Sequence, residues 1–325
     1  MNSPGEHALD WGVERLHLRL SQVMPNLAVE VVSKIASTNT ALLERARVPS
    51  RLSSDFDMDG LRRLPEGKAF GRRNADYQPC LLVAEQQTHG RGRQGRSWQS
   101  QPGASLTFSL AIPLAPADWS GFSLAVGVAL AEALDPAGAR DATGASPTRP
   151  WIGIKWPNDL WLMPPAGAAA EGRKLGGLLI ETVSAGALKL AVVGVGLNVL
   201  PMNLDEAQAT SGFACLHELD STATAPAVLA RVALPLVEAL QQFSRSGLAG
   251  FAERFAARDV LRGRMVIAGV GVGGEAAASA GALSGVADGV AGNGALRLIT
   301  ADGLREVISG EVSVRVASTT GDVAC

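Results

Sequence analysis

The segment over residues 90–98, which reads GRGRQGRSW, constrains the fold of this chain more than any other feature. It follows an apolar segment with strand character, residues 80–87, and it satisfies the pattern G-x-G-x-x-G literally. A dinucleotide-binding fold would need a helix directly after such a loop, so that the helix N-terminus could meet a pyrophosphate. Here the loop leads through Ser100 and Pro102 into a second strand, residues 106–112. The sequence therefore excludes that fold and predicts a strand, a loop and a strand in succession.

Composition and charge limit the classes of protein to which the chain can belong. A chain of 325 residues, 47% of them hydrophobic, can bury a full-sized core and a second, smaller one. The formal net charge of −2 provides no general positive field for nucleic acid or an anionic membrane. The three cysteines are far apart and form no CxxC pair, which predicts neither a disulfide framework nor a zinc site. Neither a signal-peptide layout nor an apolar stretch of ~20 residues occurs, so we expect a cytoplasmic protein without a membrane partner.

Apolar segments of strand character alternate with amphipathic segments of helical length, which predicts a mixed α/β domain. The expected helices are 6–20, 37–47, 119–134, 225–243 and 248–257. The expected strands are 28–32, 80–87, 106–112, 175–183 and 188–199, with a hairpin over 153–163. From Asp259 onward, short strand-like segments separated by Asp-Gly and Asn-Gly turns predict a small domain of barrel type. We therefore expect a first domain over 1–258, a second over 259–318 and a tail over 319–325.

Residues 48–78 interrupt this alternation. They are rich in Arg, Asp, Gly and Pro and show no sustained period, which predicts a loop insertion, with a disordered segment as the alternative to an ordered loop. The insertion contains the spacing of a calcium-binding loop, from Asp55 to Glu66. An EF-hand also needs a helix on each side and an apolar residue at the eighth loop position, which is Arg62 here. The sequence therefore disfavours calcium binding, and we expect no metal site built by protein ligands.

Three further segments carry residues suited to a polar site. Residues 153–163 place Lys155 and Asp159 at one rim of the expected hairpin. Gly177 lies inside an apolar strand, where glycine favours close approach of a ligand or another backbone. Asn198 is a lone polar residue in an apolar run. Taken singly, each has an ordinary alternative, such as an exposed charge or a buried asparagine bonded to backbone.

Together, five segments resemble the biotin–protein ligases in their order, their spacing and their residues. They are STN at 37–39, GRGRQGRSW at 90–98, KWPND at 155–159, RKLGG at 173–177 and GVGLN at 194–198. The resemblance implies a mixed-sheet catalytic domain similar to class II synthetases, followed by a small SH3-like β-barrel domain. Some members of the family carry an N-terminal DNA-binding domain. Only about 28 residues precede the first expected strand here, so we expect a form without that domain and no DNA partner.

The resemblance also implies an activity. The family joins biotin and ATP into biotinyl-5′-AMP and transfers biotin to a lysine of an acceptor protein. We therefore expect a ligase whose substrates are ATP and biotin and whose acceptor is the biotin carboxyl carrier protein of acetyl-CoA carboxylase. Mg²⁺ is expected because the charge of the triphosphate must be neutralised.

The resemblance implies roles for particular residues at the matching positions. The implied catalytic residues are Lys155, Arg91, Lys174 and Asp159. The implied biotin-binding residues are Ser37, Thr38, Asn39, Gln87, Gly90, Arg91, Gly92, Arg93, Lys155 and Gly177. The implied ATP-binding residues are Arg91, Arg93, Arg96, Trp98, Lys174 and Asn198. Trp98 is also suited to packing the base of the arginine loop.

Two alternative functions stay open at this stage. A lipoate–protein ligase is similar in fold and chemistry, although the motifs at residues 90–98 and 155–159 favour biotin. A non-catalytic anion- or nucleic-acid-binding module would use the arginine loop alone. The net negative charge and the absence of interleaved aromatic residues disfavour this second alternative.

Overall fold

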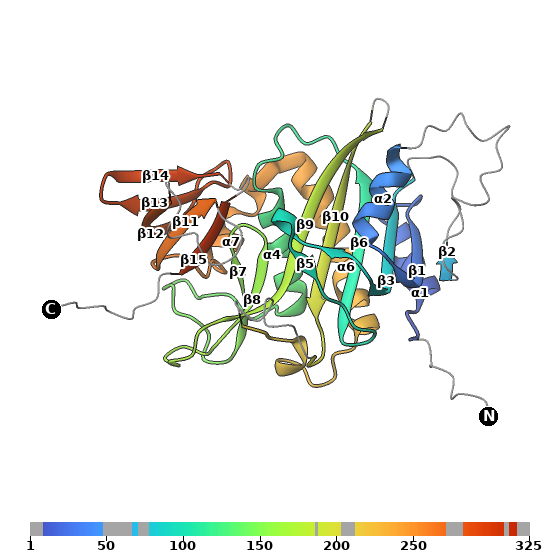
Figure 1. The fold of residues 1–325 in the computed structure, drawn as a ribbon, viewed down its shortest axis with the longest axis horizontal. Coiled ribbons are helices and arrows are strands. Elements are labelled where there is room, and N and C mark those ends of the chain that lie inside the picture. The colour runs from blue at the N-terminus through green and yellow to red at the C-terminus, as the bar shows by residue number, and fades with distance from the viewer. Residues whose placement is uncertain are drawn as a thin grey trace.

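The computed structural model describes residues 9–47, 67–70, 78–185, 188–202, 212–270, 282–308 and 312–316. These residues form an eight-stranded mixed sheet with helices on both faces, followed by a separate five-stranded sheet (Figure 1). In Figure 1 the small sheet lies at the left, beside the end of the large sheet that β7 and β8 form. The expected α/β fold with a small C-terminal β domain is confirmed.

The large sheet has the strand order β2-β1-β3-β6-β10-β9-β8-β7. Its strands are β1 (Ala28–Ile35), β2 (Gly67–Phe70), β3 (Cys80–Gln87), β6 (Ser105–Pro113), β7 (Trp151–Lys155), β8 (Asp159–Met163), β9 (Arg173–Ala185) and β10 (Leu188–Asn198). Strands β1 and β3 pair in parallel, and the other pairs of this sheet are antiparallel. The predicted strand–loop–strand succession is confirmed, because β3 and β6 are neighbours joined by a small hairpin of β4 (Gly90–Arg91) and β5 (Ser97–Trp98).

The two faces of the large sheet differ in polarity. On β6, Phe108 and Ile112 point into the larger core, whereas Thr107, Ser109 and Ala111 alternate with them toward the opposite face. Helices α1 (Val13–Ser21), α4 (Phe122–Leu134), α6 (Ala225–Ser246) and α7 (Ala252–Ala256) supply the larger core. Helix α2 (Thr38–Arg47) covers the opposite face. Among the described residues, α2 is the helix that covers the more polar face.

The helices follow from their sequence patterns. Apolar residues of α6 recur at helical spacing, from Val228 through Val232 and Leu236 to Phe243, and all of them are buried. The side chain of Thr224 accepts a hydrogen bond from the backbone N–H of Ala227 and caps the first turn. The expected helices 225–243 and 119–134 are confirmed within a few residues. The expected helix 248–257 is divided into the short 3₁₀ turn η4 (Gly247–Gly250) and α7.

The small sheet is antiparallel, in the order β14-β13-β12-β11-β15. Its strands are β11 (Met265–Val270), β12 (Leu283–Val290), β13 (Leu296–Thr300), β14 (Gly303–Val307) and β15 (Val312–Val316). The predicted Asn-Gly and Asp-Gly turns are found at Gly294 and Gly303, both with positive φ. Positive φ is readily adopted by glycine, which explains why these dipeptides end the strands.

Two sequence expectations differ from the structure. A strand, β2, lies within the expected loop 48–78 and pairs with β1 at the edge of the large sheet. A four-residue edge strand is too short to show a period, which explains why the pattern missed it. The rest of that insertion, including the calcium-loop spacing from Asp55 to Glu66, lies outside the described residues except for 78. The first helix begins at Val13 rather than residue 6, after Gly12 with φ 53°.

The linker before the small sheet is hydrogen-bonded to β7. The backbone N–H of Ile154 donates to Arg258 O, and the N–H of Val260 donates to Ile154 O. The indole N–H of Trp156 donates to Gly294 O at 2.9 Å, in the turn between β12 and β13. The small sheet is thereby attached to the segment that follows Lys155.

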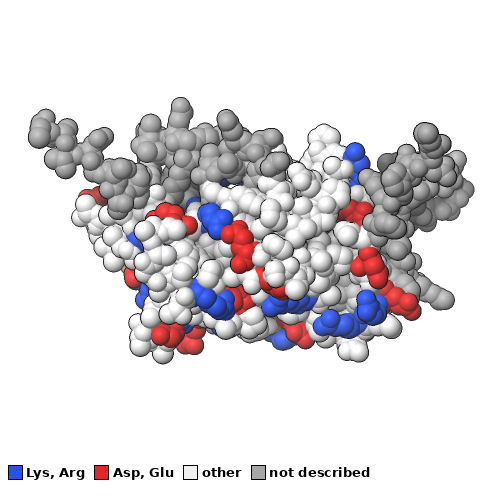
Figure 2. All heavy atoms as spheres, turned by 90° about the horizontal axis from the view of Figure 1, so that it is seen from below, with Lys and Arg blue, Asp and Glu red and all other residues white. Residues whose placement is uncertain are grey.

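Charge is distributed without a dominant sign. On the face that Figure 2 shows, Lys and Arg lie interspersed with Asp and Glu over the part of the chain that is described. Among the described residues, no helix is long and apolar enough to cross a membrane.

Asp259 in this linker generates a prediction about pH. It is fully buried, its Oδ1 accepts from the N–H of Leu261, and its Oδ2 has no hydrogen-bond partner among the described residues. Burial raises the pKa of Asp259 to about 6, from 3.8. Because the folded-state pKa is the higher one, the protonated form stabilises the fold, and this stability is lost as pH rises from about 4 through about 6.

We therefore expect wild type to lose about 3 kcal/mol of unfolding free energy relative to Asp259→Asn across this window, at about 1.4 kcal/mol per pKa unit. The measurement is urea unfolding of both proteins at pH 4, 5, 6 and 7.5. Parallel pH profiles for the two proteins would show that Asp259 does not titrate in this range.

Candidate active site

A row of directly paired residues crosses the polar face of the large sheet. Thr107 of β6 pairs with Gly196 of β10, which pairs with Gly177 of β9. Gly177 pairs with Asp159 of β8, and Asp159 pairs with Lys155 of β7. Directly opposite residues of antiparallel strands point to the same face. The charged side chains of Asp159 and Lys155 therefore lie at one end of this row, and the two glycines at its centre have no side chains.

Two side chains fill part of the space that the glycines of β10 leave. A Cβ on Gly194 would lie 2.3 Å from Asn39 Oδ1, and a Cβ on Gly196 would lie 2.4 Å from the indole of Trp98. Asn39 comes from the first turn of α2 and Trp98 from β5, so both elements rest directly on β10 backbone. Glycines are required here because side chains approach the β10 backbone so closely.

A chain of buried polar groups links α2 to the sheet. Ser109 Oγ donates to Asn39 Oδ1 at 2.5 Å, which uses its single hydrogen. Thr38 Oγ1 lies 2.6 Å from Ser109 Oγ and 3.1 Å from Gln87 Oε1, so its single hydrogen is shared between these two acceptors. The backbone N–H of Thr38 donates to Gln87 Oε1 at 2.8 Å. Asn39 Nδ2 donates in turn to Glu181 Oε2 at 3.0 Å and to Leu179 O.

This chain fixes the orientation of the Gln87 amide. Its oxygen is occupied by Thr38, so its NH₂ group is turned toward Gly90, where a Cβ would lie 3.3 Å from Nε2. No hydrogen-bond partner for Nε2 is found among the described residues. A Cβ on Gly90 would also lie 2.2 Å from Trp98 O, so this position requires glycine. The result is a half-buried amide donor beside bare backbone.

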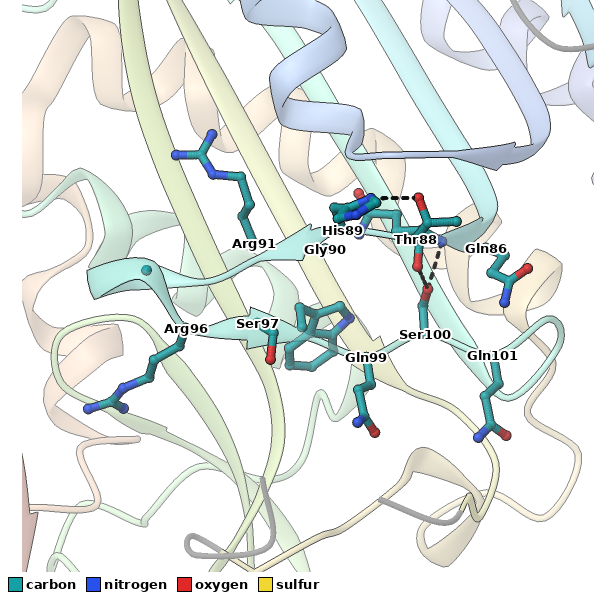
Figure 3. A pocket seen from close by; sticks show the side chains of 13 residues that line it. Gln86, Thr88, His89, Gly90, Arg91, Arg96, Ser97, Gln99, Ser100 and Gln101 are labelled. Atoms are coloured by element: carbon teal, nitrogen blue, oxygen red, sulfur yellow. Dashed lines mark hydrogen bonds between the residues drawn. The ribbon is translucent and has the colours of Figure 1, made fainter. Parts of the chain in front are cut away.

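The arginine loop is a two-stranded hairpin. Gly90 pairs with Trp98 and Arg91 with Ser97, and the 3₁₀ turn η2 (Arg93–Gly95) closes it. A hollow of about 710 Å³ lies along the hairpin, lined by residues 86–91 and 95–101 (Figure 3). Figure 3 shows Arg91 and Arg96 leaving the hairpin on opposite sides. The expectation of a loop after β3 is correct, and its hairpin form is what the structure adds.

The three arginines have different partners. Arg91 makes an ion pair with Glu181 at 3.2 Å and reaches Thr40 Oγ1 at 3.4 Å. Arg93 donates to Asn158 Oδ1 at 3.1 Å, and burial lowers its pKa without removing its charge at neutral pH. Arg96 is exposed and contacts Gln94. Arg91 therefore lies above β9, and Arg93 lies beside the turn that separates Lys155 from Asp159.

Two lysines lie near the charged end of the glycine row. Lys174 Nζ is 2.9 Å from Asp159 Oδ1, and a Cβ on Gly177 would lie 3.5 Å from that ammonium. Lys155 Nζ lies 4.3 Å from the centroid of the Trp161 ring. Cations beside a floor without side chains are suited to hold an anionic group that needs space at the backbone.

Most sequence-predicted site residues are brought together by this geometry. Ser37 accepts from the N–H of Thr40 at the start of α2, and the N–H of Gly92 donates to Arg96 O within the hairpin. Asn198 is buried, and its Nδ2 donates to Ala214 O at 2.9 Å and weakly to Lys174 O. Backbone bonding was the ordinary alternative stated for this asparagine, and the structure shows that bonding.

Sequence reasoning missed three residues of the site: Ser109, Glu181 and Trp161. Ser109 and Glu181 hold Asn39, and Trp161 lies under Lys155. A serine inside an apolar strand is a signal for Ser109, but strand register is needed to place it opposite Gly194. In the described part of the chain, no group of three or more His, Cys, Asp and Glu side chains is arranged to hold a metal ion.

The Asn39–Gly194 contact generates a stability prediction. Gly194→Ala would force Asn39 away from Ser109 and Glu181, so we expect a loss of about 1–3 kcal/mol of unfolding free energy. Gly292→Ala is the matched control, because nothing lies within 4 Å of a Cβ there. Chemical denaturation of both variants checks this. A Gly194→Ala protein as stable as the control would contradict the close contact.

Two protein-family models match this chain, one in the part that forms the large sheet and one in the part that forms the small sheet. Residues 69–198 match the model of the biotin/lipoate A/B protein ligase family, and residues 277–315 match that of the biotin protein ligase C-terminal domain. The chain is 31% identical over 239 residues to the bifunctional ligase/repressor BirA of Escherichia coli, covering 72% of this chain and 66% of that protein. It is 33% identical over 174 residues to the biotin–[acetyl-CoA-carboxylase] ligase of Mycobacterium tuberculosis. This match covers 53% of this chain and 49% of that protein.

The fold is similar to that of a solved biotin protein ligase from Aquifex aeolicus in complex with biotin and ATP. That similarity has a TM-score of 0.62 and 23% identity, and it covers 89% of this chain and 99% of that one. The chain spans just under two thirds of the length of the BirA proteins it matches. Sequence motifs, family models and fold agree, and the chain belongs to the biotin/lipoate A/B protein ligase family.

Proposed function

We propose that this protein is an ATP-dependent biotin–protein ligase. It forms biotinyl-5′-AMP and transfers biotin to a lysine of an acceptor, the biotin carboxyl carrier protein of acetyl-CoA carboxylase. The observation that carries the proposal is the glycine row that ends at Asp159 and Lys155, with Lys174 beside Gly177. A floor of bare backbone beside two cations suits two anionic substrates that must approach each other. The relatives named as biotin ligases support biotin as the substrate.

Biotin would lie between the hairpin and the start of α2. Its bicyclic ring system has a polar ureido end and an apolar thioether end, and the apolar end would pack beside the indole of Trp98. The NH₂ of Gln87 is held as a donor beside Gly90 and would donate to the ureido oxygen. The groups proposed to contact biotin are Ser37, Thr38, Asn39, Gln87, Gly90, Arg91, Gly92, Arg93, Lys155 and Gly177.

In the first step the biotin carboxylate attacks the α-phosphorus of ATP, and pyrophosphate leaves. Lys155 and Lys174 would offset the negative charge that builds up as the two anions meet. Arg91, Arg93 and Arg96 would bind phosphate oxygens. Asn198, whose Nδ2 already donates to backbone, would present its oxygen to the adenine amino group, next to Trp98. Mg²⁺ would enter with the triphosphate, because the described residues provide no cage of their own.

In the second step the amine of the acceptor lysine attacks the carbonyl of biotinyl-5′-AMP, and AMP leaves. Asp159 pairs with Lys174 in this structure. Released from that pair, its carboxylate would orient the incoming amine and accept its proton. Chemistry of this kind requires positioning and charge compensation rather than a covalent enzyme intermediate.

Lipoate is the main alternative substrate, since the matching family model includes lipoate ligases. The test is to mix the protein with Mg-ATP and either biotin or lipoate and to measure pyrophosphate release. We expect release with biotin and little with lipoate. Release with lipoate alone would identify a lipoate ligase, and release with neither would favour a non-catalytic anion-binding protein.

Lys155 is the residue whose charge matters most to the proposed first step. Lys155→Gln keeps a hydrogen-bonding side chain, one bond shorter, but removes the charge, so adenylate formation should fall by about 10²–10³-fold. Transfer from presynthesised biotinyl-5′-AMP should fall less, because no phosphate is then attacked. Lys189→Gln is the control, since this lysine lies over Trp119 rather than at the site. Wild-type adenylate formation by Lys155→Gln would contradict the assigned role.

Arg91 generates a prediction about retention of the intermediate. In this structure it is paired with Glu181. Arg91→Ala should release biotinyl-5′-AMP into solution faster, because a cation that covers the phosphate is lost. Glu181→Gln frees Arg91 from its ion pair and should retain the intermediate at least as well as wild type. The measurement is the dissociation rate of radiolabelled adenylate, and equal rates in all three proteins would argue against a clamp.

A further inference from the structure

Trp161 lies beneath the lysine to which the proposed mechanism gives most weight. It belongs to β8, where it pairs with Gly153 of β7, two residues before Lys155. The two side chains are therefore diagonal neighbours on one face of the sheet. The Trp161 ring is only 9% exposed, and the ammonium of Lys155 lies 4.3 Å from its centroid.

The buried indole N–H of Trp161 lowers the stability of the fold. Its Nε1 is buried and has no hydrogen-bond partner among the described residues. A buried donor without a partner destabilises a fold, and a phenyl or aliphatic side chain would avoid that penalty. What the indole offers beyond packing is its π face, which attracts a cation more strongly than the rings of Phe or Tyr do. The contact with Lys155 therefore accounts for tryptophan at this position.

The two lysines of the site are held by different kinds of partner. Lys174 is paired with the carboxylate of Asp159, which cancels its charge in this structure. Lys155 lies over the neutral ring of Trp161 and pairs across the hairpin with Asp159.

We propose that Trp161 is a positioning residue that fixes the ammonium of Lys155 by a cation–π contact. The consequence for catalysis rests on the proposed function, whereas the placement of Lys155 does not. The structure also contains a matched pair far from the glycine row, in which Lys189 Nζ lies 5.3 Å from the centroid of Trp119. The same substitution in the two pairs separates an effect at the site from a general effect of losing a tryptophan.

The first measurement follows the lysine itself. Purified proteins are acetylated briefly with an amine-reactive ester, and labelling of Lys155, Lys174 and Lys189 is measured by mass spectrometry. Trp161→Leu should raise the labelling rate of Lys155 roughly 2- to 30-fold, the range that the strength of a cation–π contact allows, and Trp161→Phe should raise it less. Trp119→Leu should raise labelling of Lys189 alone. Unchanged labelling of Lys155 in a folded Trp161→Leu protein would overturn the proposal.

The second measurement follows adenylate formation in a double-mutant cycle. Trp161→Leu should lower its kcat by roughly 2- to 30-fold with little change in the KM for biotin. In a Lys155→Gln background the same substitution should have almost no further effect, because the cation is already absent. Equal effects in both backgrounds would show a merely structural role and overturn the proposal.

The two measurements also separate this inference from the proposed function. Increased labelling of Lys155, together with no adenylate from wild type, would support the placement and reject the ligase activity. Melting temperatures of all variants identify any that are unfolded. Trp161→Phe serves as the folded variant if Trp161→Leu fails, because it removes the unpaired N–H while keeping an aromatic ring.

Discussion

The close approach of side chains to the bare backbone of β10 is the constraint on which the rest of the site depends. Asn39 lies against Gly194 and Trp98 lies against Gly196, each closer than a side chain on β10 would allow. The first contact sets where α2 begins, and the second sets where the β4–β5 hairpin lies. Glycines weaken a strand on their own, but β10 is paired along its length with β6 and β9, and this pairing holds its glycine backbone in place.

Buried hydrogen bonds convert that packing into a defined pattern of donors. Ser109 gives its one hydrogen to Asn39, and the hydroxyl of Thr38 lies within hydrogen-bond distance of both Ser109 Oγ and Gln87 Oε1. Gln87 is then held as an acceptor from Thr38, with its NH₂ turned to Gly90. Each group in such a chain is oriented by its neighbour, and an unsatisfied member would destabilise the fold. The start of α2 therefore connects this helix to the large sheet through hydrogen bonds, and it also forms the polar wall of the candidate site.

The charged end of the site lies at the edge of the large sheet, where the C-terminal part of the chain covers it. Ile154 is hydrogen-bonded to the linker at Arg258 and Val260, and Trp156 is hydrogen-bonded to Gly294 in the small sheet. Lys155 lies between these two anchored residues. An edge strand with unpaired backbone groups is otherwise open to pairing with other chains. Covering this edge satisfies the backbone of β7 and fixes the segment that carries Lys155.

The sequence by itself determined the features that depend on local pattern. The loop at 90–98 between two strands, the hairpin carrying Lys155 and Asp159, the long helices and the turn-rich small domain all follow from short-range periodicity and turn residues. The motifs also identified most residues of the candidate site. Only the tertiary structure decided strand register, which aligns Gly196, Gly177 and Asp159 with Lys155. Strands buried on both faces show no alternation, so their sequence reveals neither the face nor the partner of a residue such as Ser109 or Trp161.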